Sequence, residues 1–460
     1  MKLTDIQIIG VTCSTQPFQY RSPMKFGGRV VRDVTVFDTV VKVKTRNGKT
    51  AEGFGSMTMG NIWAWPAGKT EPADSLETMI QFGKKIVRSA AEYREWGHPL
   101  ELTYDFSKQY TPLAETVIKS KSKSKSIDAE PIPKLAQLVA ASPFEAAVFD
   151  AYGRVHSENV YNLLSEEFCN RDLSYYLGNE FEGEYLDRYT LRTPKNRMSL
   201  YHLVGALDPL TNTEVNEPLN DGLPETFAQW ISFNGLTHIK IKLNGDQLDW
   251  DVNRVIAIDR IAEEEQTKRG CTEWVYSADF NERCPNVEYV LEFLKKIEEK
   301  STAAIRRLQY LEQPTNRNLK AFPENTMHQA AAIKPVVIDE SLVDLESLHD
   351  SRKMGYSGVA LKACKGQSEA LLMAAAAQKY KMFLCVQDLT CVGASFLHSA
   401  TLSARIPTVA AIEGNGRQYC PKANIGWDKK YPSMFVIKDG TLGTFVLNEQ
   451  GLGFSKENLQ

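Results

Sequence analysis

The second half of this 460-residue chain repeats one unit: a short apolar run that ends in polar or charged residues, followed by a helical stretch. From about residue 199 the runs are SLYHLVGAL, THIKIKLN, EWVYSADFN, LQYLEQP, PVVIDES, GVALKACKG, KMFLCVQD and TVAAIEGN. Apolar runs that alternate with helices are typical of parallel β/α units. Eight such units close into a barrel whose active site lies at the carboxyl ends of the strands. We therefore predict an α/β fold with a (β/α)8 TIM-type barrel. The alternative, an open doubly wound sheet, would carry a glycine-rich phosphate turn after its first strand, and none is present.

The first 70 residues predict a small antiparallel meander. LTDIQIIGVT, TVFDTVVKVKT and AEGFGSM alternate apolar and polar residues, and Asn47-Gly48 supplies a tight turn between the last two. Two segments, 17–28 and 60–68, are predicted to be loops that form a lid over a ligand. The second segment carries Trp63 and Trp65 between glycines, and exposed aromatic side chains on such a loop suit a lid. Local packing of these aromatic side chains onto the sheet is the alternative.

Helices are expected at 74–95, which opens with an Asp cap, and at 142–164, which opens with a Ser-Pro pair. The stretch KSKSKSKS at 119–126 buries nothing and predicts a solvated loop. Residues 165–200 are polar and irregular and predict an insertion.

The composition excludes several classes of protein. The 54 Lys and Arg residues nearly balance the 57 Asp and Glu residues, for a net charge of −3, whereas a nucleic-acid-coating protein would show a basic excess. No window reaches the ~18 uncharged apolar residues of a membrane span, and the N-terminus predicts a strand rather than a signal peptide. The eight cysteines are scattered without a CxxC pair, as expected of reduced thiols. We predict a cytoplasmic protein with no nucleic-acid or membrane partner; a homo-oligomer is left open.

Functional groups in such a barrel are expected at the last residue or two of each strand. That position holds Lys240 and Lys242, Asp279 and Asn281, Glu312, Asp339 and Glu340, Lys362, Asp388, and Glu413. Three consecutive strands therefore end in a carboxylate. Three acids aimed at one point repel each other unless a cation neutralises them, and hard oxygen ligands select Mg²⁺. The pattern predicts one Mg²⁺ per subunit, although each acid taken singly would be read as a helix cap.

The lysines suggest proton transfer. Lys240 and Lys242 are two apart on one strand and share a face, and a second ammonium close by makes one lysine a usable base. Lys362 ends the sixth strand, diametrically opposite the second. A substrate between them would meet a lysine on either face, which suits removal of a proton next to a carboxylate. The alternative is that the lysines only balance the acids in salt bridges.

Taken together, these motifs resemble the enolase superfamily. KIK at 240–242, DFN at 279–281, EQP at 312–314, DES at 339–341 and LKACKG at 361–366 are similar to the mandelate racemase/muconate lactonizing enzyme family, closest to the muconate lactonizing enzyme subgroup. The resemblance covers nearly the whole chain. It implies an N-terminal α+β capping domain at 1–140, completed by residues about 415–460, and a barrel domain at 141–414.

The resemblance also implies roles for individual residues. It implies Asp279, Glu312 and Asp339 as Mg²⁺ ligands, Lys242 and Lys362 as acid/base catalysts, and Lys240 as an electrostatic helper. Glu413 resembles an acid often found at the eighth strand, and the predicted substrate-binding set is Asn281, Asp388, Glu413 and Trp63. Three features depart from the family pattern: DFNERC, the lack of a glutamate in GFGSM, and Gln387-Asp388 where the mandelate racemase branch has a catalytic histidine.

These residues predict a Mg²⁺-dependent enzyme that removes the α-proton of a small carboxylate substrate through an enediolate, giving racemisation, epimerisation or cycloisomerisation. The alternative on the same scaffold is a lyase that dehydrates a hydroxylated or sugar acid. A metal-free aldolase with a Schiff base on Lys362 is disfavoured by the three carboxylates. A non-catalytic binding protein is disfavoured by the complete set of lysines and acids.

Overall fold

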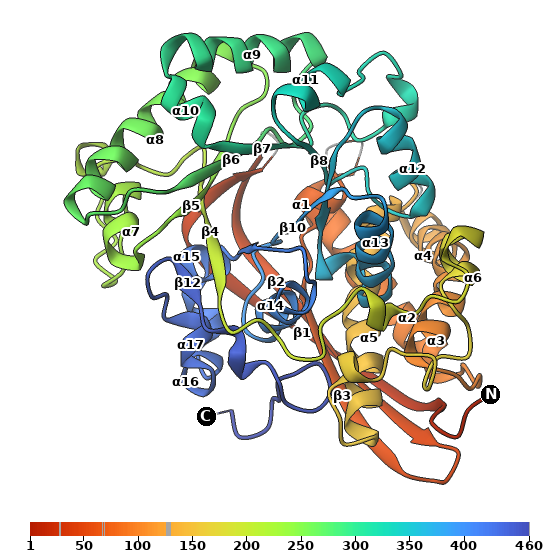
Figure 1. Ribbon diagram of the computed structural model, residues 1–460. Coiled ribbons are helices and arrows are strands. Elements are labelled where there is room, and N and C mark those ends of the chain that lie inside the picture. The colour runs from red at the N-terminus through yellow and green to blue at the C-terminus, as the bar shows by residue number, and fades with distance from the viewer. Residues whose placement is uncertain (27–28, 67, 69, 126–129, 460) are drawn as a thin grey trace.

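Eight parallel strands close into a barrel in the computed structural model, which describes residues 1–26, 29–66, 68, 70–125 and 130–459 (Figure 1). The strands follow one another around the barrel in sequence order, and the last pairs with the first. They are β4 (Met198–Val204), β5 (His238–Lys242), β6 (Val275–Asp279), β7 (Leu308–Glu312), β8 (Val336–Ile338), β9 (Gly358–Leu361), β10 (Phe383–Val386) and β11 (Ala411–Glu413). Seven of the eight lie within the predicted runs, β4 begins one residue before its run, and the predicted barrel is confirmed.

Helices fill the connections between these strands and form the outer ring of Figure 1. They are α7 (Phe227–Asn234), α8 (Leu248–Lys268), α9 (Val287–Lys300), α10 (Thr302–Arg307), α11 (His328–Ile333), α12 (Leu345–Lys353), α13 (Gln367–Lys379) and α14 (Ala394–Arg405). After the barrel come α15 (Gly416–Tyr419), α16 (Trp427–Lys430), α17 (Pro432–Phe435) and the two-residue strand β12 (Thr441–Leu442), which pairs with the start of β4.

The N-terminal part forms a three-stranded antiparallel sheet, as the alternation predicts. Its strands are β1 (Ile6–Phe26), β2 (Arg29–Thr45) and β3 (Thr50–Thr58), followed by α1 (Asn61–Ala64), α2 (Pro72–Ala91), α3 (Pro99–Ser107), α4 (Tyr110–Lys125) and α5 (Lys134–Val155). One apolar core runs through this capping region and the outer layer of the barrel.

Helix α5 packs directly onto the cap sheet through small residues. A Cβ atom built at Gly53 or Gly55 of β3 would collide with the backbone of α5, at Ala147 and Pro143 respectively. Only glycine therefore permits this close approach of strand and helix. The GFGS sequence of β3 has a packing role, and the predicted domain boundary at 140/141 falls inside α5.

The chain after the barrel returns to this helix. Asp150 of α5 is 2% exposed and accepts hydrogen bonds from the backbone N–H of Phe54 (2.9 Å) and of Leu452 (2.9 Å). It also pairs with Arg154 at 2.7 Å. One buried carboxylate thus joins the cap sheet, its helix and the C-terminal segment.

Two of the helix predictions were wrong in their starting points. The helix expected at 142–164 begins at Lys134 and contains Pro143 in its interior. A proline there removes the N–H that would bond the carbonyl of Val139, and the Ser142 hydroxyl donates to that carbonyl instead (2.9 Å). The helix expected at 74–95 spans Pro72–Ala91, and its N-cap position is Glu71 with no side-chain cap.

Two predicted loops were also wrong. Residues 119–125 of the Lys/Ser stretch continue helix α4, and Lys121 donates to the carbonyl of Asp74 (3.1 Å). Residues 17–26 belong to strand β1, because β1 and β2 continue as a long hairpin; 27–28 lie outside the described residues. The segment predicted as irregular at 165–200 contains only short helical turns up to the start of β4 at Met198, and its being an insertion stays a prediction.

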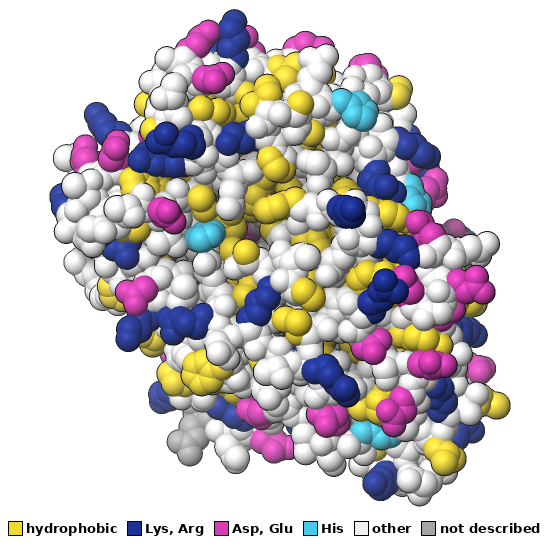
Figure 2. Space-filling view, in the orientation of Figure 1, with side chains coloured by type: hydrophobic (Ala, Val, Ile, Leu, Met, Phe, Trp, Pro, Cys, Tyr) yellow, Lys and Arg dark blue, Asp and Glu magenta, His cyan; other side chains and the backbone are white. Residues whose placement is uncertain are grey.

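The hairpin of β1 and β2 reaches the carboxyl ends of the barrel strands. Lys25 donates to Asn244, just after β5 (2.9 Å), and Arg21 pairs with Asp221 in the loop after β4 (2.5 Å). On the face shown in Figure 2, acidic and basic side chains are interspersed. Among the described residues, no helix is long and apolar enough to cross a membrane.

Because Gly55 leaves no room for a side chain, Gly55→Ala should destabilise the protein by about 1–3 kcal/mol, the usual range for overpacking. Gly10→Ala on β1 is the control, since a Cβ there would meet only Lys42 at an ordinary 3.8 Å. Urea unfolding followed by circular dichroism measures both. Equal stability of Gly55→Ala and the wild type would contradict this packing.

Candidate active site

The register of the barrel brings the predicted site residues to one rim. In the parallel ladder Lys242 lies beside Asp279, and Asp279 lies beside Glu312. Asp339 and Lys362 each follow directly after the next two strands, β8 and β9. All five residues are at most 4% exposed. The five residues that the sequence places at strand ends therefore lie together at one rim, and their metal-binding and catalytic roles stay predictions.

Lys240 is the cation at the centre of the buried acids. Its Nζ lies close to three carboxylates: Asp279 (3.0 Å), Glu312 (2.8 Å) and Glu413 (2.8 Å). It also donates to Gln387 Oε1 at 2.5 Å, and Gln387 is held in turn by Tyr310 (2.8 Å). Burial opposes the charge of Lys240, but the three carboxylates outweigh it and hold its pKa well above the ordinary value. These contacts therefore favour the charged form of Lys240.

Lys242 and Lys362 each lie beside one acid. Lys242 forms an ion pair with Asp279 and donates to Asn281 Oδ1 (3.0 Å). Lys362 pairs with Asp339 (2.9 Å) and donates to the backbone carbonyl of Asp388 (3.2 Å). Burial would lower the pKa of Lys362, but Asp339 reverses this and raises it.

The pKa values of the buried acids shift in opposite directions. Burial raises the pKa of Asp279 and Asp339, but the neighbouring lysines outweigh it and lower both values. Glu312 differs, because burial and then the charge of Asp279 raise its pKa well above the ordinary range. Its Oε2 is buried and has no hydrogen-bond partner among the described residues.

Three residues to which the sequence prediction gave no role belong to this cluster. Lys365 is 2% exposed, and its Nζ lies 2.5 Å from the carbonyl and 3.2 Å from Oδ1 of Asp339. It follows Lys362 by three residues, through the 3₁₀ turn Ala363–Lys365, and that spacing places both on one side. The amide oxygen of Gln313 accepts the N–H of Asp339 (3.0 Å) and fixes the turn after β8. Glu340 is the third.

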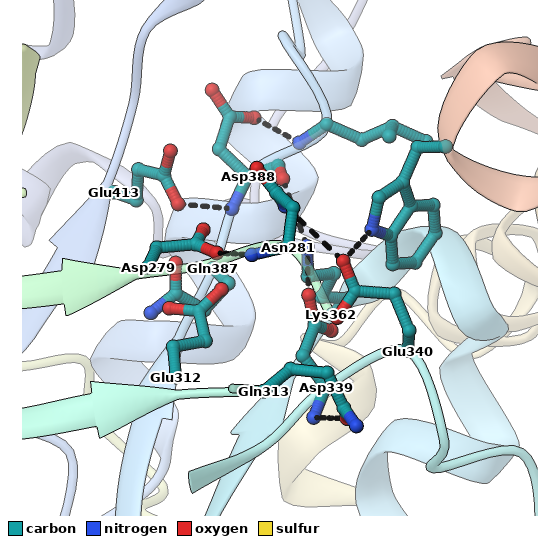
Figure 3. Close-up of polar contacts among 12 residues, drawn as sticks. Asp279, Asn281, Glu312, Gln313, Asp339, Glu340, Lys362, Gln387, Asp388 and Glu413 are labelled. Carbon is teal, nitrogen blue, oxygen red and sulfur yellow. Dashed lines mark hydrogen bonds and ion pairs between the residues drawn. The ribbon is translucent and has the colours of Figure 1, made fainter. Parts of the chain in front are cut away.

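Trp63 and Glu340 join the cap to the barrel mouth. Trp63 lies on α1, is 5% exposed, and donates from its indole N–H to Glu340 Oε1 (3.0 Å). Asn281 donates to the same oxygen (3.2 Å), as Figure 3 shows. The Trp63 ring also lies over Lys362, with Nζ 4.2 Å from its centroid. Burial and then the charge of Asp339 raise the pKa of Glu340 to about 7.

Asp388 is engaged by the backbone. Its carboxylate accepts the N–H groups of Leu389 (2.9 Å), Cys391 (2.8 Å) and Asn415 (2.7 Å). Burial and the charge of Glu413 raise its pKa to about 6. These bonds hold the turns after β10 and β11, so a contact between this carboxylate and substrate stays a prediction.

The donor set suits a hard divalent cation. Asp279, Glu312 and Asp339 supply only carboxylate oxygens, the ligands that Mg²⁺ prefers, and Glu312 Oε2 has no other partner. As the side chains lie, the lysines share the space between the acids. No group of three or more His, Cys, Asp or Glu residues among those described is close enough to hold a metal. The residues fit the ion in chemistry, and binding would require the ammonium groups to turn aside.

Comparison with known proteins agrees with this architecture. The family described as enolase C-terminal domain-like matches residues 223–457, about half of the chain. The chain therefore belongs to the enolase superfamily, in the mandelate racemase/muconate lactonizing enzyme family of enzymes.

Solved structures share the fold over nearly the whole chain at low identity. A muconate lactonizing enzyme from Pseudomonas fluorescens is 17% identical with a TM-score of 0.60, covering 97% of this chain and 96% of its own. The L-Ala-D/L-Glu epimerase of Bacillus subtilis is 15% identical with a TM-score of 0.63, covering 97% and 98%. A dipeptide epimerase from Enterococcus faecalis is 15% identical with a TM-score of 0.61, covering 98% and 99%. No curated protein sequence matches the chain.

Lys240→Met should destabilise the protein by about 3–5 kcal/mol, because it leaves buried carboxylates without their shared cation. Added Mg²⁺ should restore part of this loss. Lowering the pH should also reduce the difference in unfolding free energy between Lys240→Met and the wild type. The reason is that acids without a balancing cation bind protons more tightly in the folded than in the unfolded state.

Thermal unfolding at several pH values, with and without Mg²⁺, measures these effects. Lys296→Met is the matched control, because Lys296 lies at the surface, 3.6 Å from the exposed Asp249. If the loss of stability in Lys240→Met is the same at every pH and with or without Mg²⁺, the three acids do not depend on Lys240 for their charge balance.

Proposed function

We propose that this protein removes the α-proton of a small carboxylate substrate, giving racemisation, epimerisation or cycloisomerisation by way of an enediolate. One observation carries the proposal: Lys242 and Lys362 end strands on opposite sides of the barrel, each beside a carboxylate at the mouth. Three strands separate β5 from β9 in either direction around the closed sheet. A flat substrate held between them would present one face to each lysine.

In this proposal the residues have separate tasks. Lys242 and Lys362 move protons on the two faces of the α-carbon. Lys240 stays charged, because three carboxylates surround it, and it stabilises negative charge that develops on the substrate carboxylate. Asn281 orients Lys242, and the Trp63 ring covers Lys362 and excludes water from its side of the site.

Asp279, Glu312 and Asp339 would hold one Mg²⁺. The ion would supply Lewis-acid stabilisation of the enediolate. Support comes from the carboxylate donor set and from relatives, since the Enterococcus dipeptide epimerase was solved with Mg and a dipeptide. The Pseudomonas enzyme was solved with muconolactone.

The two lysines should be separable by experiment. For a racemase, Lys242→Ala should block α-proton exchange from one enantiomer, and Lys362→Ala should block exchange from the other. For a cycloisomerase or a dehydratase, one lysine should be indispensable for proton loss. Exchange in D₂O, followed by proton NMR over a panel of carboxylic acids with Mg²⁺, measures this.

The opposite result has a definite meaning. If neither substitution changes exchange at saturating Mg²⁺ and both only weaken metal binding, the lysines balance charge and the acid/base assignment is wrong. Lys296→Ala is the control for loss of a lysine at the surface.

Removal of the metal should abolish activity. EDTA should stop exchange and Mg²⁺ should restore it, and Asp279→Asn, Glu312→Gln and Asp339→Asn should each weaken Mg²⁺ binding about 10-fold or more. Calorimetric titration with Mg²⁺ gives the affinity, with Asp249→Asn, 85% exposed in its side chain, as the control. Full exchange in excess EDTA would refute a role for the metal.

A further inference from the structure

A separate cavity lies on the outer side of the barrel wall, where β4 faces helix α7. Its volume is about 210 Å³, and its walls are the end of β4, α7, the loop between them, α15 and the irregular stretch of β1 at 21–23. None of its lining residues belongs to the candidate active site. Because a cavity of ~150 Å³ can hold benzene, this space accommodates a small organic molecule.

His202 of β4 lines this cavity. Tyr201, the residue before it, packs in the barrel interior with residues of the other strands, so His202 faces outward, since successive side chains of a strand alternate. Its ring lies against Trp230 of α7, which is on the outside of β4 in Figure 1, with centroids 5.2 Å apart. His202 is 4% exposed, and its ring nitrogens have no hydrogen-bond partner among the described residues.

The imidazole of His202 offers an acceptor to this cavity. Burial, and then the charge of Arg417, lower the pKa of His202 to about 3, so the ring is neutral near pH 7. A neutral imidazole carries one donor and one acceptor nitrogen.

Gln418 of α15 supplies a second acceptor at the cavity wall. It is 6% exposed and donates through Nε2 to Asp208 Oδ2 (3.0 Å). A carboxylate only accepts, so the amide nitrogen must face Asp208 and the amide oxygen is left over. That oxygen is buried and has no hydrogen-bond partner within the described part of the chain. A buried acceptor without a partner marks a position where a ligand or water supplies the missing donor.

Carboxylates outnumber basic groups around the cavity. Four of them line it: Asp208, Glu214, Glu217 and Glu225. Glu225 is half-buried and accepts the backbone N–H of Leu219 through Oε1 (2.9 Å). Neither Glu217 nor Glu225 has an ion pair with any described residue. Their charges are therefore available to a ligand.

The basic side chains near the cavity are engaged elsewhere. Arg21, the one arginine among its lining residues, is paired through two nitrogens with Asp221 (2.5 and 2.7 Å). Arg254 and Arg417 donate to backbone carbonyls and do not line the cavity. The wall therefore presents acceptors and negative charge.

We propose that this cavity binds a small organic cation with a primary ammonium group, at a site separate from the barrel mouth. An ammonium group has three N–H donors and no acceptor, which suits His202, Gln418 and Glu225. The carbon body of the ligand lies against Phe227 and Trp230, and an aromatic face also attracts a cation. A bare metal ion is disfavoured, because no group of three or more His, Cys, Asp or Glu residues among those described is close enough to hold one.

The test compares probes that differ in charge and in N–H donors. The probes are n-butylamine, 1-butanol as its neutral counterpart, and tetramethylammonium, which is charged but has no N–H. Each is titrated by calorimetry into the full chain at pH 7 with Mg²⁺ in an amine-free buffer. The proteins are the wild type, Glu225→Gln, His202→Phe and His202→Gln. Glu264→Gln is the control, because Glu264 is an exposed glutamate on α8 that does not line the cavity.

The amine should bind the wild type roughly 10- to 100-fold more tightly than 1-butanol, as expected for a hydrogen bond to a charged group. Tetramethylammonium should bind more weakly than the amine, because it cannot donate. Glu225→Gln and His202→Phe should each weaken binding of the amine roughly 10-fold, and His202→Gln, which keeps an acceptor, should retain part of the affinity. Glu264→Gln should bind like the wild type.

Three results would overturn the inference: no measurable binding of the amine, equal binding of the amine and 1-butanol, or an amine affinity that Glu225→Gln leaves unchanged. Glu225→Gln keeps the oxygen that accepts the N–H of Leu219, so it decides the test even if His202→Phe does not fold. Circular dichroism checks the folding of each variant.

Hydrogen exchange of the backbone amides locates the bound amine. Exchange at 211–225, the loop between β4 and α7, should slow when n-butylamine is bound and stay unchanged with 1-butanol. Slower exchange at the barrel rim alone would mean that the amine lies among the rim carboxylates, which would also contradict the inference. The proton chemistry proposed for the rim is untouched by any of these results, because the two sites share no residue.

Discussion

The balance of charge around Lys240 is the constraint on which the barrel mouth depends. Its ammonium group connects acids on three strands, β6, β7 and β11, so that it ties opposite sides of the mouth together. Removing these carboxylates from water is unfavourable unless cations compensate them. Lysines on β5 and after β9 meet this need within the chain. A divalent ion bound by the same acids would take over part of that compensation, so lysine and metal are alternative partners for the same oxygens.

The cap positions the other half of the site. Gly53 and Gly55 let the sheet lie directly on α5, and the sheet carries the segment with Trp63 to the mouth. Trp63 then contacts Glu340 and Lys362 from above. Sheet packing far from the chemistry therefore sets the position of a side chain in contact with a candidate catalytic lysine.

The sequence predicted the barrel and the rim residues well because both follow from local rules. Each strand showed its own apolar run, and each candidate site residue stood at a run's end, so that Asp279 and Lys362 could be placed without knowledge of distant contacts. The same rules do not report where a side chain finds its partner. Lys365 looked like the start of a helix, and only the fold brings it to Asp339. Pro143 looked like a helix start because its compensation by Ser142 is visible only in three dimensions. The end of β1, residues 17–26, was read as a loop, whereas the strand in fact continues across Pro17.

The carboxylate of Asp150 has a consequence for how the protein is made. It bonds the backbone at residues 54 and 452, which are translated about 400 residues apart. The first sheet is therefore translated long before the segment around Leu452 that supports it. The cap must wait in a partly supported state while about 300 further residues emerge, at roughly 5–20 residues per second. Its long apolar strands are exposed for that interval, so the nascent chain depends on the early docking of α5 onto the glycine-bearing strand to keep the sheet from pairing elsewhere.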